Sequence, residues 1–393
     1  MNPKDTDAAP LRILEMCTMF GVGGISRHVL ELSNWLRGRG HQLFFAGSPG
    51  PWLSETLDPD FVTLGTQGAS GDNPNMASRL AYLATSAATL RAWLKRHPVD
   101  LIHAHESAPA LVARLAAFGL KIPIAVTYHG SDQGRVGQFG TIARFATDLV
   151  LTVSHRSARD LASLGRVPAE RLKVIGLGVK TPPPVAAERA ATVRSQLLGA
   201  SGRLLVVTVA RLTEQKGVDL LVEVARRVGA ERRDIHFAVV GDGPQQHLVQ
   251  GWAEAAGVEA NLHFVGRSEE PELYLAAADL FLLTSRWEAL PFTIVEAFQM
   301  GVPALATDCG GVAELIDDSV GQVLPIGDVE AISRTVIALA DDAPRRQAMS
   351  QAALARSRED RFSPDHVHGE IEQTYRDLAR AGLPLHPSTH ERR

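Results

Sequence analysis

The chain of 393 residues is 45% hydrophobic and 6% aromatic, carries a formal net charge of -4, and exceeds the length that a single hydrophobic core usually supports. Because it contains only two cysteines, Cys17 and Cys309, a disulfide framework is excluded, and both are expected to be buried packing residues in a protein of a reducing compartment. The N-terminus has no signal-peptide core and no apolar run approaches the roughly 18 residues of a membrane span, so a cytoplasmic protein is expected.

In the first part of the chain, short apolar strands alternate with helical patterns, which is typical of parallel sheets covered by helices. Helices are expected at 24–36, 76–96 and 108–118. Strands are expected at 12–17, 42–46, 101–105, 124–128, 149–153 and 173–177.

The pattern breaks at Thr181-Pro-Pro-Pro184, because three prolines fit neither a helix interior nor a central strand. Further strands are expected at 204–210, 235–240, 262–265, 280–284, 303–307 and 321–324. We therefore predict two tandem, doubly wound Rossmann-like domains, 1–180 and 181–362, whose ligand crevices face each other across a cleft. A last helix, 363–384, has no strand before it and is expected to pack back on the first domain.

Two carboxylates, Glu288 and Glu296, lie on either side of an expected helix start. Pro291 suits the first helical position, and an apolar helix follows until Gly301. The first amides of this helix, beginning at Phe292, lack partners within the helix and lie at the positive end of its dipole, so they favour an anion. Because helical side chains lean toward the N-terminus, Glu296 is expected to point back toward Glu288.

The segment Val209-Ala-Arg-Leu-Thr-Glu-Gln-Lys-Gly217 follows an expected strand and precedes a helix, which places Arg211 and Lys216 on a loop at the strand's carboxyl end. A diphosphate carries about two negative charges, and each charge-assisted hydrogen bond contributes roughly 1.5–3 kcal/mol. An exposed basic pair on a turn is the alternative interpretation. Together with the helix start at Phe292, the pair indicates a phosphate site.

The glycines of Gly21-Val-Gly-Gly-Ile-Ser-Arg-His28 lie between the first strand and the first helix, where Gly23 and Gly24 allow a ligand to approach the backbone. Ser26 occupies the third glycine position of a dinucleotide fingerprint, and no Gly-Lys-Ser/Thr follows. A nicotinamide dehydrogenase and a nucleoside-triphosphate loop are therefore disfavoured. A tight turn without a ligand remains the alternative, and His28 is expected to be a packing residue.

His129 ends an expected strand in Thr127-Tyr-His-Gly-Ser-Asp132, which directs it at the cleft as either a functional or a structural histidine. His103 and His105 share one face of another expected strand and could bind zinc together with His129. The sequence offers no convincing acid or cysteine to complete such a set, so no metal site is predicted.

Together these motifs resemble the retaining glycosyltransferases of family 4, which have the two-domain GT-B fold, and the resemblance covers nearly the whole chain. The motifs are Glu288 and Glu296 within 278–314, Arg211 and Lys216 within Ala-Arg-Leu-x-x-x-Lys-Gly, the pair Gly23-Gly24, and His129. One difference is Gly176-Leu-Gly-Val-Lys180, where the family often has Asn-Gly-Val-Asp, and it bears on contacts between the domains.

The resemblance also implies a role for each site residue. Glu288 would accept hydrogen bonds from the donor hexose and Glu296 from the nucleotide ribose, while His129 would lie beside the hexose or turn its carbonyl toward the developing oxocarbenium charge. Fixed basic groups and amides would take the place of a metal, so no cofactor is implied. The residues expected around the diphosphate are Gly23, Gly24, Arg211, Lys216, Leu290, Pro291 and Phe292.

The implied reaction is retaining transfer of a hexose from a nucleoside-diphosphate sugar to a glycan or lipid-linked acceptor, in envelope, capsule or exopolysaccharide biosynthesis. The alternatives are a sugar-nucleotide epimerase or a phosphorylase of the same fold, and a non-catalytic sugar-nucleotide-binding protein. Residues 1–180 carry 19 Lys and Arg against 14 Asp and Glu, a net charge of +5. Peripheral contact with the anionic inner face of a membrane is therefore considered, whereas no dense basic run predicts a nucleic-acid partner.

Overall fold

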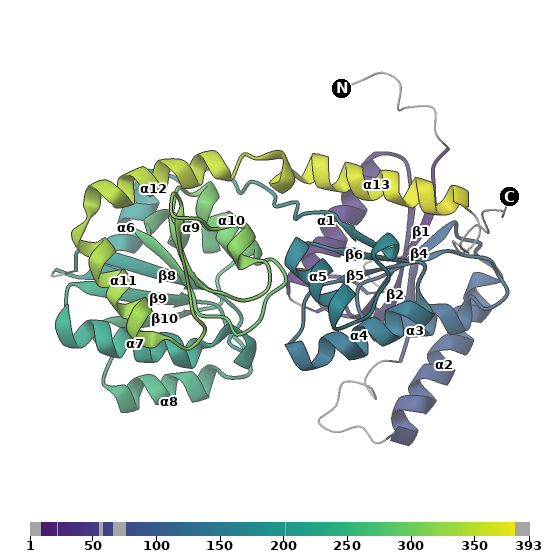
Figure 1. The fold of residues 1–393 in the computed structure, drawn as a ribbon, viewed down its shortest axis with the longest axis horizontal. Coiled ribbons are helices and arrows are strands. Elements are labelled where there is room, and N and C mark those ends of the chain that lie inside the picture. Colours follow the sequence, from purple (N-terminus) through teal and green to yellow (C-terminus); the bar gives the residue numbers. More distant parts are fainter. Residues whose placement is uncertain (1–8, 22, 55–57, 66–75, 201, 382–393) are drawn as a thin grey trace, which may run out of the picture.

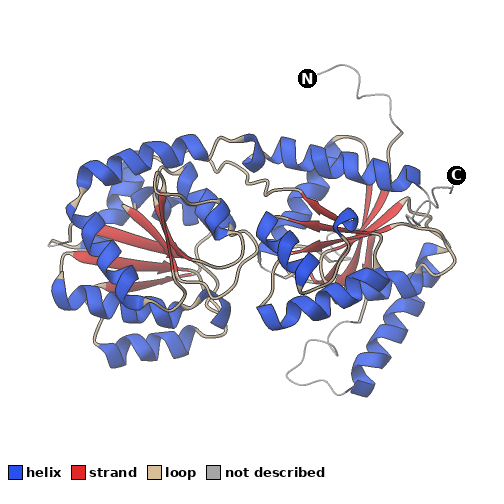
Figure 2. Cartoon of the chain, in the orientation of Figure 1, coloured by secondary structure: helices blue, strands red, loops and turns tan. Residues whose placement is uncertain are grey.

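A computed structural model describes residues 9–21, 23–54, 58–65, 76–200 and 202–381. In this part of the chain, two parallel sheets each have helices on both faces (Figure 1, Figure 2). The first sheet contains β1 (Arg12–Met19), β2 (Gln42–Ser48), β3 (Phe61–Thr63), β4 (Leu101–Ala104), β5 (Ile124–Tyr128), β6 (Leu149–Thr152) and β7 (Leu172–Val174). The second contains β8 (Leu204–Val209), β9 (Ile235–Val240), β10 (Leu262–Gly266), β11 (Leu280–Leu283), β12 (Ala304–Thr307) and β13 (Gly321–Leu324).

The helices fall into two groups that cover the two sheets. Around the first sheet lie α1 (Gly24–Gly38), α2 (Met76–Leu94), α3 (Ser107–Ala116), α4 (Gln133–Ala146) and α5 (His155–Ser163). Around the second lie α6 (Ala187–Leu198), α7 (Val218–Glu231), α8 (Gln246–Ala256), α9 (Pro271–Ala277), α10 (Phe292–Gln299), α11 (Val329–Asp341) and α12 (Ala343–Arg356). The last helix is α13 (Pro364–Ala381), and short 3-10 turns include η2 (Glu214–Lys216) and η4 (Asp360–Phe362).

The strand order places a crevice at the carboxyl edge of each sheet. The first sheet runs β3-β2-β1-β4-β5-β6-β7 and the second β10-β9-β8-β11-β12-β13. The order reverses between β1 and β4 and again between β8 and β11, which are the points where open α/β sheets bind ligands. The loops after β1, β8 and β11 carry Gly23 and Gly24, Arg211 with Lys216, and Glu288, while His129 follows β5. The predicted fold class, two tandem Rossmann-like units of the GT-B type, is confirmed.

Local sequence explains these elements. Strand β8 is a run of Leu, Val and Thr that is almost wholly buried, as expected for a parallel strand with helices on both faces. Helix α7 buries Val218, Leu221, Val222, Ala225 and Val228, which recur every three or four residues and so form one apolar stripe. Both cysteines are buried and unpaired, as predicted.

The structure differs from the predicted elements in several places. The three-residue strand β3 was not predicted, because so short a run shows no periodicity. The helix was expected to begin at Pro291 or Phe292; the ψ of Pro291, 119°, is extended, so Pro291 is the N-cap and α10 begins at Phe292. Strand β7 ends at Val174, earlier than expected, and no helix or strand is assigned from there to α6.

The chain returns to the first sheet at its C-terminal end. Figure 1 shows α12 over the second half and α13 over the first, and α13 contacts α1 and β4. Trp35 of α1 donates a hydrogen bond to Asp365 of α13 at 2.7 Å. The segment 176–180 runs beside η4, where Val179 N donates to Phe362 O at 2.9 Å. Residues 382–384 of the predicted helix lie outside the described residues.

None of the helices in the described residues is both long enough and apolar enough to cross a bilayer.

Candidate active site between the two halves

Lys216 and Glu288 form an ion pair at the carboxyl edge of the second sheet. Lys216 Nζ lies 2.5 Å from Glu288 Oε1, and Ser285 Oγ donates to the same carboxylate at 2.6 Å. Lys216 reaches this position because Gly217 adopts a left-handed φ of 58°, and a Cβ there would lie 2.2 Å from the carbonyl of Thr284. Glu288 is only 8% exposed, so the pair is held in a low-dielectric setting.

Arg211 lies on the same loop, two residues beyond the end of β8. Its side chain is exposed, and no hydrogen-bond or ion-pair partner for it lies among the described residues. The guanidinium is therefore open to solvent, which fits both the predicted phosphate site and the alternative of an exposed basic pair on a turn.

The N-terminus of α10 faces the first half of the molecule. No side chain caps this helix, and Pro291 has no amide hydrogen. Gly24, at the start of α1, lies opposite: a Cβ added to it would lie 3.8 Å from the Phe292 ring. Gly23 has open space around its Cβ position. The start of α1 and the start of α10 therefore lie against each other between the halves.

Glu296 has a protein partner that the sequence interpretation did not include. Arg27 of α1 lies 2.5 Å from the Glu296 carboxylate and 3.0 Å from Glu31, and its guanidinium is 5.8 Å from the Phe292 ring centroid. Although burial opposes its charge, Glu296 and Glu31 raise the pKa of Arg27. The sequence could have indicated Arg27 as a site residue, because it lies one turn into the helix that follows Gly23-Gly24.

His129 follows β5 and lies at the end of a cluster of buried polar side chains. Glu15 of β1 is 0% exposed and contacts the rings of His103 and His105 at 3.2 and 2.7 Å. His105 Nδ1 lies 3.2 Å from His129 Nε2. The expectation that no acid accompanies these histidines was therefore wrong, because Glu15 lies in register with His103 on the neighbouring strand. The sequence could have indicated Glu15, because it is a carboxylate inside an otherwise apolar strand.

The side chains of Glu15, His103 and His105 each bring a potential ligand atom within 4.8 Å of the others. These atoms are already engaged with one another or with Thr127 and Tyr375: His103 Nε2 lies 2.7 Å from Thr127 Oγ1, and His103 Nδ1 lies 2.5 Å from the Tyr375 hydroxyl. The geometry is that of a hydrogen-bonded network.

The loop 288–290 forms one of the contacts between the halves. Gly130 has a φ of +88°, and a Cβ there would lie 2.7 Å from Ala289 N. A Cβ on Gly310 would lie 1.8 Å from the Glu288 carbonyl, so glycine is required on the other side of the loop as well. The side chains of Leu290 and Pro291 are buried, and Leu290 lines a cavity of about 190 Å³ between the halves.

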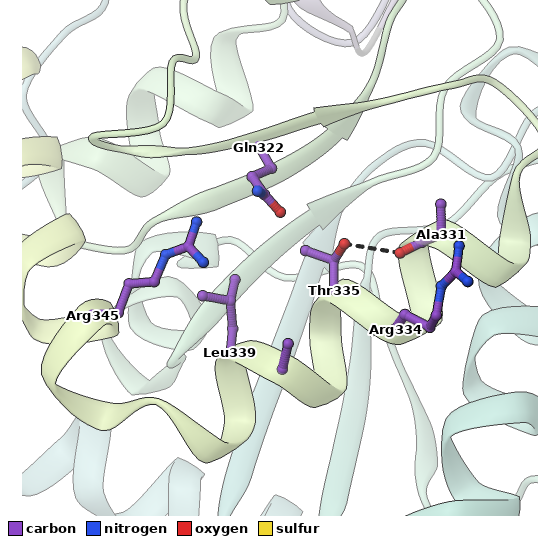
Figure 3. Close-up of a pocket in the computed structure, with 7 residues that line it drawn as sticks. Gln322, Ala331, Arg334, Thr335, Leu339 and Arg345 are labelled. Carbon is purple, nitrogen blue, oxygen red and sulfur yellow. Dashed lines mark hydrogen bonds between the residues drawn. The ribbon is translucent and has the colours of Figure 1, made fainter.

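A second hollow, of about 310 Å³, lies elsewhere (Figure 3). It is lined by Gln322 of β13 and by side chains of α11, including Thr335, whose hydroxyl donates to Ala331 O at 2.8 Å. None of the predicted site residues lines it, and α11 lies at the end of the second half away from the first half (Figure 1).

Comparison with known proteins places this geometry in a family. Residues 22–181 match the family model described as Glycosyltransferase Family 4, and residues 191–356 match that of Glycosyl transferases group 1. N-acetyl-alpha-D-glucosaminyl L-malate synthase of Bacillus anthracis is 26% identical over 91% of this chain and 95% of its own. A GDP-mannose-dependent monoacylated alpha-(1-6)-phosphatidylinositol monomannoside mannosyltransferase of Corynebacterium glutamicum is 29% identical over 69% of this chain and 75% of its own.

Among solved structures, Anabaena Alr3699/HepE in complex with UDP-glucose superposes with a TM-score of 0.77 at 21% identity, over 93% of this chain and 100% of its own. This similarity establishes the fold. The two family models cover successive halves of the chain, and their border falls at the proline-rich segment between the sheets. The chain is therefore a glycosyltransferase that belongs to family 4 and has the GT-B fold.

Proposed function

We propose that the enzyme transfers a hexose, with retention of anomeric configuration, from a nucleoside-diphosphate sugar to a glycan or lipid-linked acceptor in cell-envelope polysaccharide biosynthesis. The observation that carries this proposal is the ion pair of Lys216 and Glu288 beside the uncapped start of α10 and opposite Gly24. A diphosphate needs fixed positive charge and free amides, and a hexose needs a carboxylate, and these groups lie together here.

The names of related proteins support both substrates. The Anabaena structure holds UDP-glucose, and the Corynebacterium relative uses GDP-mannose and a phosphatidylinositol mannoside. A sugar nucleotide and a lipid or glycan acceptor are therefore the first pair to test. The Corynebacterium relative is named a mannosyltransferase, which favours transfer over epimerisation or phosphorolysis.

In the proposed reaction the acceptor hydroxyl attacks the anomeric carbon on the face from which the diphosphate leaves. The bond between the anomeric carbon and the phosphate oxygen breaks, its electron pair leaves with the nucleoside diphosphate, and the acceptor proton passes to a phosphate oxygen. Arg211, Lys216 and the first amides of α10 stabilise the negative charge that develops on the leaving group. Glu288 holds the hexose hydroxyls and Glu296 the ribose, which requires the donor to compete with Lys216 and Arg27 for the two carboxylates.

The test is transfer of labelled hexose from UDP-, GDP- and ADP-sugars to lipid and glycan extracts, with the anomeric configuration of the product read by NMR. We expect an α-linked product from an α-linked donor, and Glu288→Gln should lower the rate by about tenfold or more, which is the loss of one charge-assisted hydrogen bond. Conversion of the donor to an epimeric sugar nucleotide without transfer would contradict the proposal.

We further propose that no divalent metal takes part, because Arg211 and Lys216 supply the positive charge that a metal would bring to the diphosphate. Activity is expected to persist in excess chelator. Loss of activity in chelator, with recovery on addition of magnesium or manganese, would contradict this assignment.

Peripheral contact with an anionic membrane is also proposed for the first half. Phe118, beyond α3, and Phe145, in the last turn of α4, are 78% and 76% exposed. Arg91 donates to the backbone carbonyl of Phe118 at 2.7 Å, and the Arg144 guanidinium lies 6.0 Å from the centroid of the Phe145 ring, so an arginine accompanies each aromatic residue. Aromatic rings with neighbouring arginines suit the interface of an anionic bilayer.

Sedimentation with phosphatidylglycerol and phosphatidylcholine vesicles tests this contact. We expect binding to the anionic vesicles alone, and loss of that binding in a Phe118→Ser/Phe145→Ser protein. Leu248→Ser, which changes an exposed leucine on the second half, is the matched control. Equal sedimentation with both vesicle types would contradict the proposal.

A further inference from the structure

A line of hydrogen-bonded side chains connects the interior of the first sheet to His129. Glu15 of β1 lies 2.7 Å from Nε2 of His105, and Nδ1 of His105 lies 3.2 Å from Nε2 of His129. Glu15 and His105 are 0% and 1% exposed, whereas His129 is half-buried. The line therefore links a fully buried carboxylate to a side chain at the carboxyl edge of the sheet.

The carboxylate decides which nitrogen carries each proton. An ionised carboxylate can only accept, so Nε2 of His105 must donate to Glu15. A neutral imidazole has one protonated nitrogen, which leaves Nδ1 of His105 as an acceptor. Nε2 of His129 is then the donor in the second hydrogen bond, and Nδ1 of His129 is left with a lone pair. No hydrogen-bond partner of that Nδ1 lies among the described residues.

The electrostatics of the cluster agree with these protonation states. Burial, together with repulsion from His103, lowers the pKa of His105 to about 3, and burial lowers the pKa of His129 well below its ordinary value. Burial alone would favour a protonated Glu15, but attraction to His103 and hydrogen bonds from His103 and His105 outweigh it and hold the pKa of this carboxyl below its usual range. The two histidines of the line are thus neutral at pH 7 and the carboxylate is ionised.

Other side chains fix the line in place. The Tyr375 hydroxyl of α13 donates to Glu15 Oε1 at 3.2 Å. The ring of His28, from α1, lies edge-on to the His129 ring with the centroids 5.6 Å apart. Glu15 is therefore held by a helix that follows the second half in sequence, and the His129 ring is restrained by the helix that begins at the glycine turn.

We propose that Glu15 and His105 are positioning residues that hold His129 in the tautomer with Nδ1 unprotonated, so that His129 offers a hydrogen-bond acceptor to a hydroxyl of the transferred hexose. The identity of the hexose rests on the proposed function, whereas the tautomer is a property of the free protein. A hydroxyl can donate to this nitrogen and a phosphate oxygen cannot. The line thus favours the sugar over the diphosphate at His129.

Nitrogen-15 NMR of the histidine rings in the full-length protein tests the tautomer without any substrate. The signals of His129 are identified by their loss in His129→Gln. We expect His129 at pH 7 to be neutral, with Nε2 protonated and Nδ1 unprotonated. A protonated Nδ1, or a doubly protonated ring, would overturn the proposal. So would a tightly bound metal in the purified protein, since the ring nitrogens would then be its ligands.

Two substitutions of His105 separate positioning from packing. In His105→Asn the amide oxygen takes the place of Nδ1 and can accept from His129, whereas His105→Leu fills the space without an acceptor. We expect His105→Asn to keep the His129 tautomer and to retain kcat within about threefold. His105→Leu should give a mixture of tautomers and lower kcat by about tenfold, the loss of one oriented hydrogen bond.

Thr127→Val is the control for damage to the cluster, because Thr127 is fully buried and contacts His103 but not His105. It should leave the His129 tautomer and kcat unchanged. Equal losses in His105→Asn and His105→Leu, or an equal loss in Thr127→Val, would overturn the proposal. If the wild-type protein transfers no sugar, the proposed function fails, and the NMR result still decides the tautomer.

Discussion

At the scale of single residues, the contact of Lys216 with Glu288 joins the residue proposed to bind the diphosphate to the residue proposed to bind the hexose. Their ion pair, with side chains only 20% and 7% exposed, satisfies both charges. In the proposed mode of binding, a diphosphate at Lys216 would release the carboxylate toward the sugar hydroxyls. Binding of the two parts of the donor would then be coupled through this pair.

The first prediction concerns this lysine. Lys216→Ala removes one cation from the proposed phosphate site and leaves the buried Glu288 carboxylate with fewer partners, so kcat/KM for the donor should fall by about tenfold or more. Steady-state kinetics with a fixed acceptor measure it. Lys95→Ala, at an exposed position of the first half, is the control and should retain full activity. Unchanged turnover in a correctly folded Lys216→Ala protein would remove the phosphate assignment.

Sequence motifs located the residues that have backbone or charge signatures, and missed their partners. Gly24, Lys216 and Glu288 could be placed because glycine turns, strand-end loops and helix starts mark such sites locally. Arg27 and Glu15 could not, because their importance comes from a carboxylate 269 residues away in one case and from rings on a neighbouring strand in the other.

At the scale of elements, α13 ties the end of the chain to the core of the first half. Its Tyr375 is 0% exposed, and the hydroxyl contacts both Glu15 and His103. The helix therefore contributes to the polar cluster as well as to the apolar packing.

The second prediction follows from this contact. Tyr375→Phe removes a hydroxyl from a buried network, so the free energy of unfolding should fall by about 1–3 kcal/mol. Urea denaturation measures the change. Tyr274→Phe is the control, because the Tyr274 hydroxyl has no hydrogen-bond partner among the described residues. Little change in the free energy of unfolding is expected for it. Equal stability of the wild type and Tyr375→Phe would show that the hydroxyl contributes nothing.

The third prediction is a pH dependence carried by the same helix. Burial lowers the pKa of His368 to about 4, from an ordinary value of 6.5, and neither ring nitrogen has a hydrogen-bond partner among the described residues. Between these values the unfolded chain binds more protons than the folded one, so stability falls as the pH is lowered from 6.5 toward 4. The slope is about 1.4 kcal/mol per pH unit for each such histidine.

Denaturant titrations at several pH values measure this slope. His368→Leu should flatten it by about one proton, while His28, His105 and His129, whose pKa values are also lowered by burial, maintain the same direction. Stability that rises on acidification would contradict the direction predicted here.

Most elements could be predicted from alternation of apolar and helical patterns, and the errors have local causes. Strand β3 is too short for a period to appear. The start of α10 was predicted to within one residue. The φ of Pro291, -76°, suits a helix, and only its ψ shows that Pro291 precedes the helix and is not its first residue. Such an angle depends on the contacts of the 288–290 loop and not on the local sequence.

At the scale of the whole molecule, close contacts bring the two crevices together. Glu314 of the second half accepts hydrogen bonds from the amides of His155 and Arg156 at the start of α5, at 2.9 and 2.6 Å. Gly130 of the first half lies against Ala289 of the second. The sequence predicted that the crevices face each other, but these contacts join residues distant in sequence and carry no local signal.

The fourth prediction tests whether the close contact of the two halves at Gly130 is needed for activity. Gly130→Ala should lower kcat/KM for the donor by about tenfold or more, because its Cβ would lie 2.7 Å from Ala289 N and would hold the halves apart. Small-angle scattering should show a larger radius of gyration. Gly40→Ala has a similar φ of +90° but open space around the Cβ, so it controls for backbone strain alone. Full activity in Gly130→Ala would mean that the enzyme does not need this close contact between the halves.

The most direct test of the central claim, that an activated sugar binds between the two halves, is a crystal structure with a nucleoside-diphosphate sugar that the enzyme uses. The account predicts the diphosphate against Arg211, Lys216 and the first amides of α10, the hexose beside Glu288 and His129, and the ribose at Glu296. A donor bound elsewhere, such as in the hollow of Figure 3, with Arg211 directed into solvent and the Lys216–Glu288 pair unchanged, would contradict it.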